Sequence, residues 1–184
     1  MTKKIAVVDI ETTGFSTEKD CIVEIGIVEL DLETGERTEL YNQLVKEENL
    51  EEKHKNCWVF ENTDMKFDDV MNAQSLDIKT LQAIFDKYPM TAYNKKFDTR
   101  FLIDRGLKMN ELDCPMIIAT NICKLPSKRL AGKYKWPKVQ EAYDFFFPDS
   151  GYIETHRGCD DAFHEAEIVY ELYKRGDFVV DCSE

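Results

Sequence analysis

The sequence predicts an α/β sandwich built around a mixed sheet, and three observations lead to this prediction. Short apolar runs rich in β-branched residues come first along the chain. Segments with apolar residues at helical spacing follow, and they then alternate with short strand-like runs. The length of 184 residues, with 43% hydrophobic and 33% charged residues, is that of one ordinary folded domain. We therefore expect a single domain over residues 1–184.

Three strands are expected in the N-terminal part of the chain. The first two are apolar runs, the second with acids between its Ile and Val residues, and the third follows a hairpin turn. The expected strands are Lys4–Asp9, Ile22–Leu30 and Thr38–Val45, with a Thr-Thr-Gly turn after the first and a hairpin turn over Asp31–Gly35. The charge-dense segment Lys46–Lys55 is expected to be a solvated loop or an exposed helix.

Helices dominate the rest of the chain. Apolar residues at helical spacing predict a helix over Ala73–Lys87 that Pro89 ends. A short strand over Met90–Tyr93 leads to a helix capped by Asn94 and stopped by Gly106. A further helix is expected over Cys159–Lys174, where small alanines on one face would let it lie close to a sheet.

Composition excludes several classes of protein. A net charge of -12 argues against a protein that coats nucleic acid, because an acidic surface repels phosphate. Acids at Asp9 and Glu11 interrupt the N-terminal apolar run too early for a signal peptide, and no apolar run reaches the ~20 residues of a membrane helix. Six cysteines without a C-x-x-C pair, and only three histidines, disfavour a zinc site. We expect reduced thiols and a cytoplasmic protein with no membrane partner.

Positive charge is concentrated in one part of this acidic chain. Residues 95–138 carry a net charge of +7, and no acid lies between Cys114 and Gln140. Aromatic residues alternate with the lysines there, as in grooves that bind single-stranded nucleic acid. The expected contacts are Lys133, Lys135 and Trp136. The alternative is a solvated basic loop whose tryptophan is held in the core.

Two acids at the end of the first strand are the first candidates for chemistry. Asp9 and Glu11 are two residues apart, so their side chains leave the strand on the same face. Neighbouring carboxylates repel each other unless a cation lies between them, and Mg²⁺ or Mn²⁺ would suit such oxygen ligands. The alternative is an ordinary solvated turn, because acids are common at exposed strand ends.

Two later segments place acids in the first turns of predicted helices. Asp98 lies in the first turn of a predicted helix, where the helix dipole alone favours an acid. His156 precedes the acids Asp160 and Asp161, which open the last helix and could serve only as caps. Each segment alone therefore has an ordinary structural explanation.

Taken in order, the three segments form a more specific pattern. The runs D-x-E-T-T-G, N-x-x-F-D and H-x-x-x-x-D resemble the DEDDh-type 3′-5′ exonuclease family, which includes RNase T-like exonucleases and the proofreading subunit of bacterial DNA polymerase III. The resemblance extends from about Ile5 to Tyr173. It implies an RNase H-like three-layer α/β/α sandwich with a mixed five-stranded sheet.

The resemblance also implies a role for each motif residue. Four acids would hold two Mg²⁺ or Mn²⁺ ions, and one histidine would be the general base. The implied metal ligands are Asp9, Glu11, Asp98 and Asp161, and the implied base is His156. The implied substrate contacts are Thr12, Thr13, Gly14 and Phe15, around the 3′-terminal nucleotide, together with Asn94. Asp160 is the adjacent alternative ligand, and His164 is expected to be a surface or packing residue.

The implied function is metal-dependent hydrolysis of single-stranded DNA or RNA from the 3′ end, with release of nucleoside 5′-monophosphates. The partners would be nucleic-acid 3′ ends, with a DNA polymerase or another replication or repair protein and a second copy of the chain as candidates. One departure is that Lys55–Asp69 lacks the His-Gly-Ile-Thr-like stretch of many relatives. The alternatives are a non-catalytic module that binds nucleic acid or a polymerase, and a haloacid-dehalogenase-type phosphatase, although Glu11 stands where the latter needs Asp.

Overall fold

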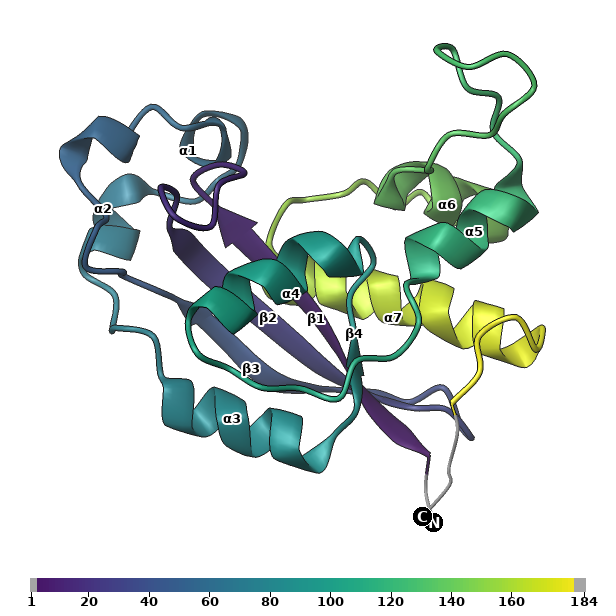
Figure 1. Cartoon of the computed structure of the whole chain (residues 1–184), viewed down its shortest axis with the longest axis horizontal. Coiled ribbons are helices and arrows are strands. Elements are labelled where there is room, and N and C mark those ends of the chain that lie inside the picture. The colour runs from purple at the N-terminus through teal and green to yellow at the C-terminus, as the bar shows by residue number, and fades with distance from the viewer. Residues whose placement is uncertain (1–2, 181–184) are drawn as a thin grey trace.

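A four-stranded mixed sheet lies at the centre of the protein, with helices packed on both of its faces (Figure 1). The structure is a computed structural model and describes residues 3–180. The strand order is β3-β2-β1-β4, with β2 antiparallel to both of its neighbours and β4 parallel to β1. The strands are β1 (Lys4–Thr12), β2 (Ile22–Asp31), β3 (Arg37–Leu44) and β4 (Met90–Thr91).

The helices divide between the two faces, which confirms the three-layer α/β/α arrangement. Helices α3 and α4 share one hydrophobic core with the sheet, and α5, α6 and α7 share the other. Two short helices, α1 and α2, lie beyond the start of β2, next to the end of β1 (Figure 1). The helices are α1 (Trp58–Asn62), α2 (Phe67–Met71), α3 (Ile78–Lys87), α4 (Lys95–Asp104), α5 (Pro115–Cys123), α6 (Val139–Phe146) and α7 (Gly158–Lys174), with a 3₁₀ turn at Glu52–His54.

The alternation of side chains along β1 decides where its acids point. Ile5 and Val7 are buried in the core that contains α5 to α7, while Ala6 and Val8 face α3 and α4. Side chains two apart share a face of a strand, so Asp9 and Glu11 continue the row that faces α7.

Two glycines allow α7 to lie directly on the sheet. A Cβ atom added to Gly26 would come within 2.1 Å of the carbonyl carbon of Gly158, and one added to Gly158 would meet the Gly26 nitrogen at 2.9 Å. Since backbone meets backbone here, no side chain fits at either position. Ala162 and Ala166 are completely buried along the same helix, which confirms the expected close packing.

The sheet has four strands among the described residues, where five were expected. The fifth position, beside β4, is taken by residues 110–112. Met90 forms one isolated parallel bridge there with Glu111, with hydrogen bonds to the backbone of Asn110 and Leu112. The segment is short and polar, and Pro115 at the start of α5 then turns the chain away, so pairing does not extend.

The region between β3 and α3 differs most from the sequence expectations. The helix expected over Ala73–Lys87 begins only at Ile78, where Asp77 accepts a capping hydrogen bond from the Thr80 amide. Helices α1 and α2 were not predicted, because each has only five residues, too few for a helical period to repeat. They are held by a separate small core of Cys21, Val23, Leu50, Val59, Met65, Phe67 and Val70.

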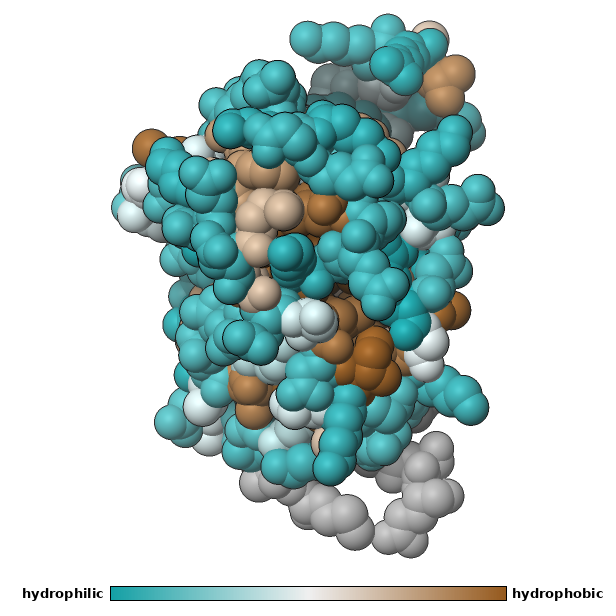
Figure 2. Space-filling model, turned by 90° about the vertical axis from the view of Figure 1, so that its left-hand side faces the viewer, coloured by the Kyte–Doolittle hydropathy of each residue, from teal (hydrophilic) through white to brown (hydrophobic). Residues whose placement is uncertain are grey.

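The surface of the described part is largely polar. The face at the left of Figure 1 is mainly hydrophilic, with small hydrophobic areas between charged side chains (Figure 2). No helix within residues 3–180 is long and apolar enough to cross a membrane. Five cysteines in this range are free thiols, and Cys182 lies outside the described residues.

Candidate active site

The site begins at the end of β1, where the strand brings two acids out of the core. Asp9 pairs in register with Gly26 and Glu11 with Glu24, on β2. The Oδ2 atom of Asp9 is buried and has no hydrogen-bond partner within residues 3–180. A buried oxygen without a partner is costly, which makes this atom a candidate ligand for a cation.

Helix α4 brings a third acid to the same place. Asn94 is the N-cap residue of α4, as expected, and Asp98 lies in the first turn. The Asp98 carboxylate accepts a hydrogen bond from the Ile10 amide at 3.3 Å, which fixes α4 against the end of β1. Asp98 is 3% exposed, and this burial raises the pKa of its carboxyl to about 8.

The first turn of α7 supplies the fourth acid, and the loop before the helix is wrapped around it. Asp161 accepts hydrogen bonds from the Tyr152 hydroxyl at 2.8 Å, the Arg157 amide at 3.1 Å and the Thr155 amide at 3.4 Å. Burial raises the pKa of Asp161, although these donors oppose the shift. The loop that carries His156 is therefore held in place by Asp161.

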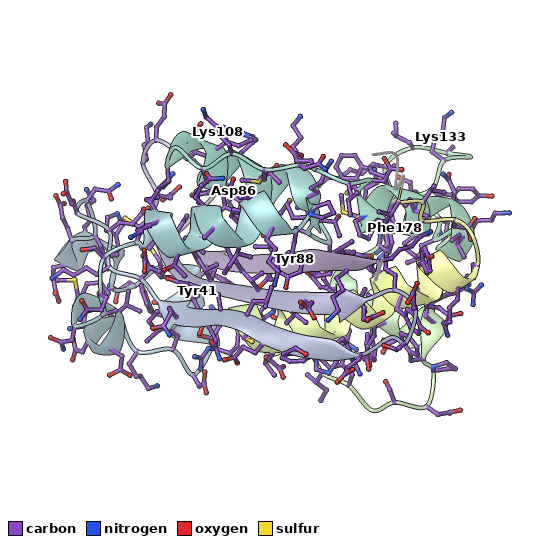
Figure 3. The ribbon with its side chains drawn as sticks, turned by 90° about the horizontal axis from the view of Figure 1, so that it is seen from below. Tyr41, Asp86, Tyr88, Lys108, Lys133 and Phe178 are labelled. Carbon is purple, nitrogen blue, oxygen red and sulfur yellow. The ribbon has the colours of Figure 1, made fainter. Side chains whose placement is uncertain are left out.

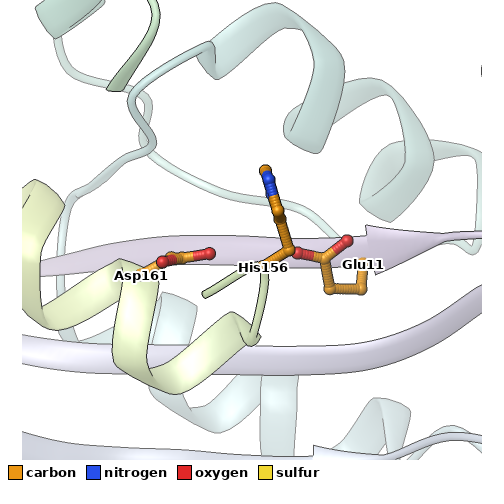
Figure 4. A group of neighbouring side chains, drawn as sticks. All are labelled: Glu11, His156 and Asp161. Carbon is orange, nitrogen blue, oxygen red and sulfur yellow. The ribbon is translucent and has the colours of Figure 1, made fainter. Parts of the chain in front are cut away.

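His156 projects from this loop toward the acids. Its backbone has φ of 54°, a left-handed conformation uncommon outside glycine. A ring nitrogen of His156 and carboxylate oxygens of Glu11 and Asp161 all lie within 4.8 Å of one another. Figure 4 shows the two carboxylates pointing toward each other from β1 and α7, with His156 between them. This arrangement is compatible with His156 as a base and also as a ligand.

We name Asp9, Glu11, Asp98 and Asp161 the carboxylate centre. Burial raises the pKa of Asp9 well above its usual range, and neighbouring negative charges raise it further. Burial and the charge of Asp161 raise the pKa of Glu11 to about 8. Oxygen donors that repel one another, including the unpartnered Oδ2 of Asp9, fit hard divalent cations such as Mg²⁺ or Mn²⁺.

An ion-pair network that sequence analysis did not find holds the end of the His156 loop. The guanidinium of Arg157 bonds to Glu24 on β2 at 2.7 Å and to Asp64, after α1, at 2.8 Å. Glu24 is 2% exposed and also accepts the Gly158 amide at 2.9 Å. The ring of Trp58 on α1 meets that of His156 edge to face, with centroids 4.9 Å apart. No local pattern predicts these pairs, because their partners are 93 to 134 residues apart.

Gln140 at the start of α6 braces the other end of the loop. Its side-chain amide donates to the Tyr152 carbonyl at 2.9 Å and its oxygen accepts the Glu154 amide at 2.8 Å. His164 stacks on the Tyr152 ring with centroids 3.9 Å apart, so it is the packing residue that the sequence predicted. Both ends of the His156 loop are thus fixed by side chains from other elements.

The Thr-Thr-Gly turn after β1 forms the rim of the site. The Thr13 hydroxyl is buried and accepts the Cys21 amide at 2.9 Å, so it holds the turn instead of facing outward. The Thr12 hydroxyl donates to the Gly14 carbonyl at 2.7 Å. Phe15 projects from the turn with 88% of its surface exposed and touches Phe97 edge-on. Of these four predicted contacts, Phe15 is the side chain best placed to meet a ligand.

Residues 124–138, the basic arm, form a loop that protrudes beyond α5 and α6 (Figure 1). A bridge between Pro126 and Tyr134 closes the arm, and Lys133 lies near its tip, at the edge of the molecule (Figure 3). Lys135 forms an ion pair with Glu141, while Trp136 is 65% exposed, so it is not a core residue.

The root of the basic arm is held by residues that adjoin the site. The Tyr93 hydroxyl donates to the Pro137 carbonyl at 3.1 Å, and Asn94 is the next residue after Tyr93. Gln140, two residues beyond the arm, holds the His156 loop. The three predicted contacts in the arm are therefore not equivalent, because Trp136 lies at the root and Lys133 at the tip.

The sequence profile of the RNase T exonuclease family matches residues 6–169 of this chain. The chain belongs to this exonuclease family. Membership confirms the predicted DEDDh-type resemblance and does not favour the phosphatase or the non-catalytic alternative. Comparison with curated proteins gives no match.

Solved structures of exonucleases share the fold. Cell-death related nuclease 4 (CRN-4) superposes with a TM-score of 0.66 at 14% identity, over 95% of this chain and 65% of that one. The nuclease domain of 3′hExo, a DEDDh family member solved with bound rAMP, gives 0.65 at 18% identity, over 100% and 98%. A full-length 3′-exonuclease gives 0.62 at 18% identity, over 97% and 62%. This chain thus spans less than two thirds of CRN-4 and of the full-length exonuclease, and nearly all of the nuclease domain.

Proposed function

We propose that this protein is a metal-dependent 3′-5′ exonuclease, formed by one domain over residues 1–184. Its substrate would be single-stranded DNA or RNA, and its products nucleoside 5′-monophosphates. The observation that carries the proposal is the convergence of Asp9, Glu11, Asp98 and Asp161 beside His156, in a chain of an exonuclease family.

The four carboxylates are the proposed ligands of two Mg²⁺ or Mn²⁺ ions. Bound there, divalent cations would neutralise the acids, clamp the scissile phosphate and lower the pKa of the attacking water. The chain supplies the geometry: β1 carries two ligands, α4 one and α7 one, so three elements of the core fix their spacing.

His156 is the proposed general base. Its imidazole would take the proton from the attacking water, while the 3′-oxygen of the preceding nucleotide leaves and gains a proton. The Tyr152, Gln140 and Arg157 contacts hold the loop that positions the ring. Glu154, whose carboxylate lies 3.8 Å from the ring Nδ1 atom, would orient the imidazole.

Substrate contacts follow from the exposed groups around the site. Phe15, beside Phe97 on α4, and Trp58, beside His156, present exposed aromatic surfaces that would stack against bases. Thr12, Thr13 and Gly14 shape the turn whose backbone would meet the terminal 3′ group, and the Asn94 side chain makes no capping hydrogen bond that would occupy it. The basic arm, with Lys133, Lys135 and Trp136, would follow the strand away from its end.

The proposal extends to the cellular location and the protein partners. A cytoplasmic location suits the reduced thiols. A replication or repair protein such as a DNA polymerase, and a second copy of the chain, are the candidate protein partners. Sedimentation of the purified protein, alone and with a polymerase, would identify either assembly.

A degradation assay tests the proposal directly. Single-stranded DNA and RNA labelled at the 5′ end are incubated with Mg²⁺ or Mn²⁺, beside the Asp9→Ala protein. We expect a ladder that shortens from the 3′ end, absent with chelator and absent in the variant. Intact strands with a protein that still binds the metal would instead favour a binding module.

A further inference from the structure

A further buried carboxylate, Glu165, lies beside the carboxylate centre, and none of the sequence motifs includes it. Glu165 is 3% exposed and follows Asp161 by four residues on α7. Side chains four apart share a face of a helix, so Glu165 points to the same side as Asp161. Its Oε2 atom accepts a hydrogen bond from the Tyr93 amide at 3.1 Å, just before α4 begins.

Glu165 is an electrostatic neighbour of the acids on all three elements. Its negative charge contributes more than any other single charge to the raised pKa of Asp9. In turn, burial and then the charge of Asp98 raise the pKa of Glu165 well above its usual range. Glu165 thus contacts the backbone just before α4, from the side of α7 that carries Asp161, and its charge acts on the acids of β1 and α4.

The hydrogen bond to Tyr93 does not explain why an acid stands here. A glutamine oxygen would accept the same N–H without any charge. A buried carboxylate among other carboxylates is unfavourable, both because burial removes water and because like charges repel. The acid becomes favourable when positive charge is bound nearby, because each cation then interacts with one more negative charge.

We propose that Glu165 is a positioning residue of the cation centre, which strengthens the binding of divalent cations to Asp9 and Asp98 through its charge and without ligating them. The inference rests on the proposed function, since it assigns a role at the same centre. Glu165 differs from the four proposed ligands because one of its carboxylate oxygens already accepts a hydrogen bond from the Tyr93 amide.

The test measures Mn²⁺ binding by the full chain, by calorimetry without nucleic acid, for the wild type and for Glu165→Gln. We expect about tenfold weaker binding in E165Q, as for the loss of one partly screened charge. In chelator, E165Q should melt at a higher temperature than the wild type, because glutamine avoids the cost of either burying a charged carboxylate or protonating it. Its gain in melting temperature on adding Mn²⁺ should be smaller.

Two further variants separate charge from hydrogen bonding and from net charge. Glu165→Asp keeps the charge but shortens the reach to Tyr93, and we expect Mn²⁺ binding close to that of the wild type. Glu167→Gln removes one charge from the same helix at a surface ion pair with Arg37, and it should leave Mn²⁺ binding unchanged.

Three outcomes would overturn the inference. Wild-type affinity in E165Q would show that the charge is not used. Weak binding in E165D together with normal binding in E165Q would assign the role to the hydrogen bond. A wild-type protein that binds no Mn²⁺ would overturn the proposed metal-dependent function as well, so the two failures are distinguishable.

Discussion

The carboxylate centre and the basic arm are built in opposite ways. The acids of the centre come from three core elements, and Asp98 and Asp161 are each 3% exposed. The arm is a surface loop closed by one isolated bridge, and Leu130, Tyr134 and Trp136 are all at least half exposed. Bond breaking requires fixed distances between charges, whereas attraction of a polyanion requires only that positive charge is present. The two regions should therefore respond very differently to substitution.

The largest contrast is expected within the centre itself. Asp161→Asn removes a proposed ligand and should lower the rate of strand degradation about a thousandfold or more, since bound metal contributes several kcal/mol to the reaction. Asp160→Asn is the matched control, because this neighbouring acid is exposed and its carboxylate contacts the Thr155 hydroxyl and the His164 ring rather than the other acids. We expect D160N to stay within about threefold of the wild type. Equal losses in the two variants would show that the ligand is misassigned.

His156→Ala distinguishes a base from a ligand. General bases contribute about 10²–10⁴-fold, so the degradation rate should fall by at least a hundredfold. Mn²⁺ affinity, measured by calorimetry, should not change. A parallel loss of affinity would assign the imidazole to the metal, which its proximity to the oxygens of Glu11 and Asp161 permits.

The acids of the carboxylate centre should make the stability of the protein depend on pH. Folding holds protons on Glu11 and Asp98 up to about pH 8, whereas the unfolded chain releases them near pH 4. The folded state then binds more protons, so stability in chelator should fall as pH rises between these values, by up to about 1.4 kcal/mol per pH unit for each proton. Added Mn²⁺ should make stability depend less on pH, because a bound cation favours the charged carboxylates. Denaturant melts across this range provide the measurement, and a stability that rises with pH in chelator would contradict it.

The smallest effects are expected in the arm. Replacing Lys133, Lys135 and Lys138 with glutamine should weaken single-strand binding only several-fold at moderate salt. The slope of log affinity against log salt should fall by about 2 at most, at ~0.7 for each phosphate contact. Single variants sharpen this result, because Lys135 is already paired with Glu141. We expect K138Q, at the root, to weaken binding more than K133Q, at the tip; unchanged affinity and slope in the triple variant would remove the arm from the substrate path.

The parts of the molecule that follow local rules could be predicted from the sequence. Alternation along the first strand placed Asp9 and Glu11 on one face, and helix-start signals placed Asp98 and Asp161 in first turns. Those positions depend only on strand and helix periods and on the order of the motifs. The structure brings all of them to one place, while their chemical roles stay predictions.

The contacts that hold the site together could not be predicted from the sequence. Arg157 meets Glu24 across 133 positions, and Tyr93 meets Glu165 across 72. Trp58 belongs to a helix of five residues that packs on a small separate core. Such contacts depend on how elements dock, which periodicity does not specify. The expected fifth strand is reduced to a single bridge for a related reason, because its segment is short and polar and Pro115 then turns the chain away.

The backbone contact of Gly26 with Gly158 has a consequence for recognising active relatives. The depth of α7 against the sheet, and hence the gap between Asp161 and the strand acids, is fixed by two residues that have no side chain. A homologue could retain every acid and the histidine and still be inactive if either glycine were replaced, since a Cβ would lift the helix away. A search for relatives that requires only the four acids and the histidine would therefore include inactive proteins. The two glycines belong in the sequence motif as well.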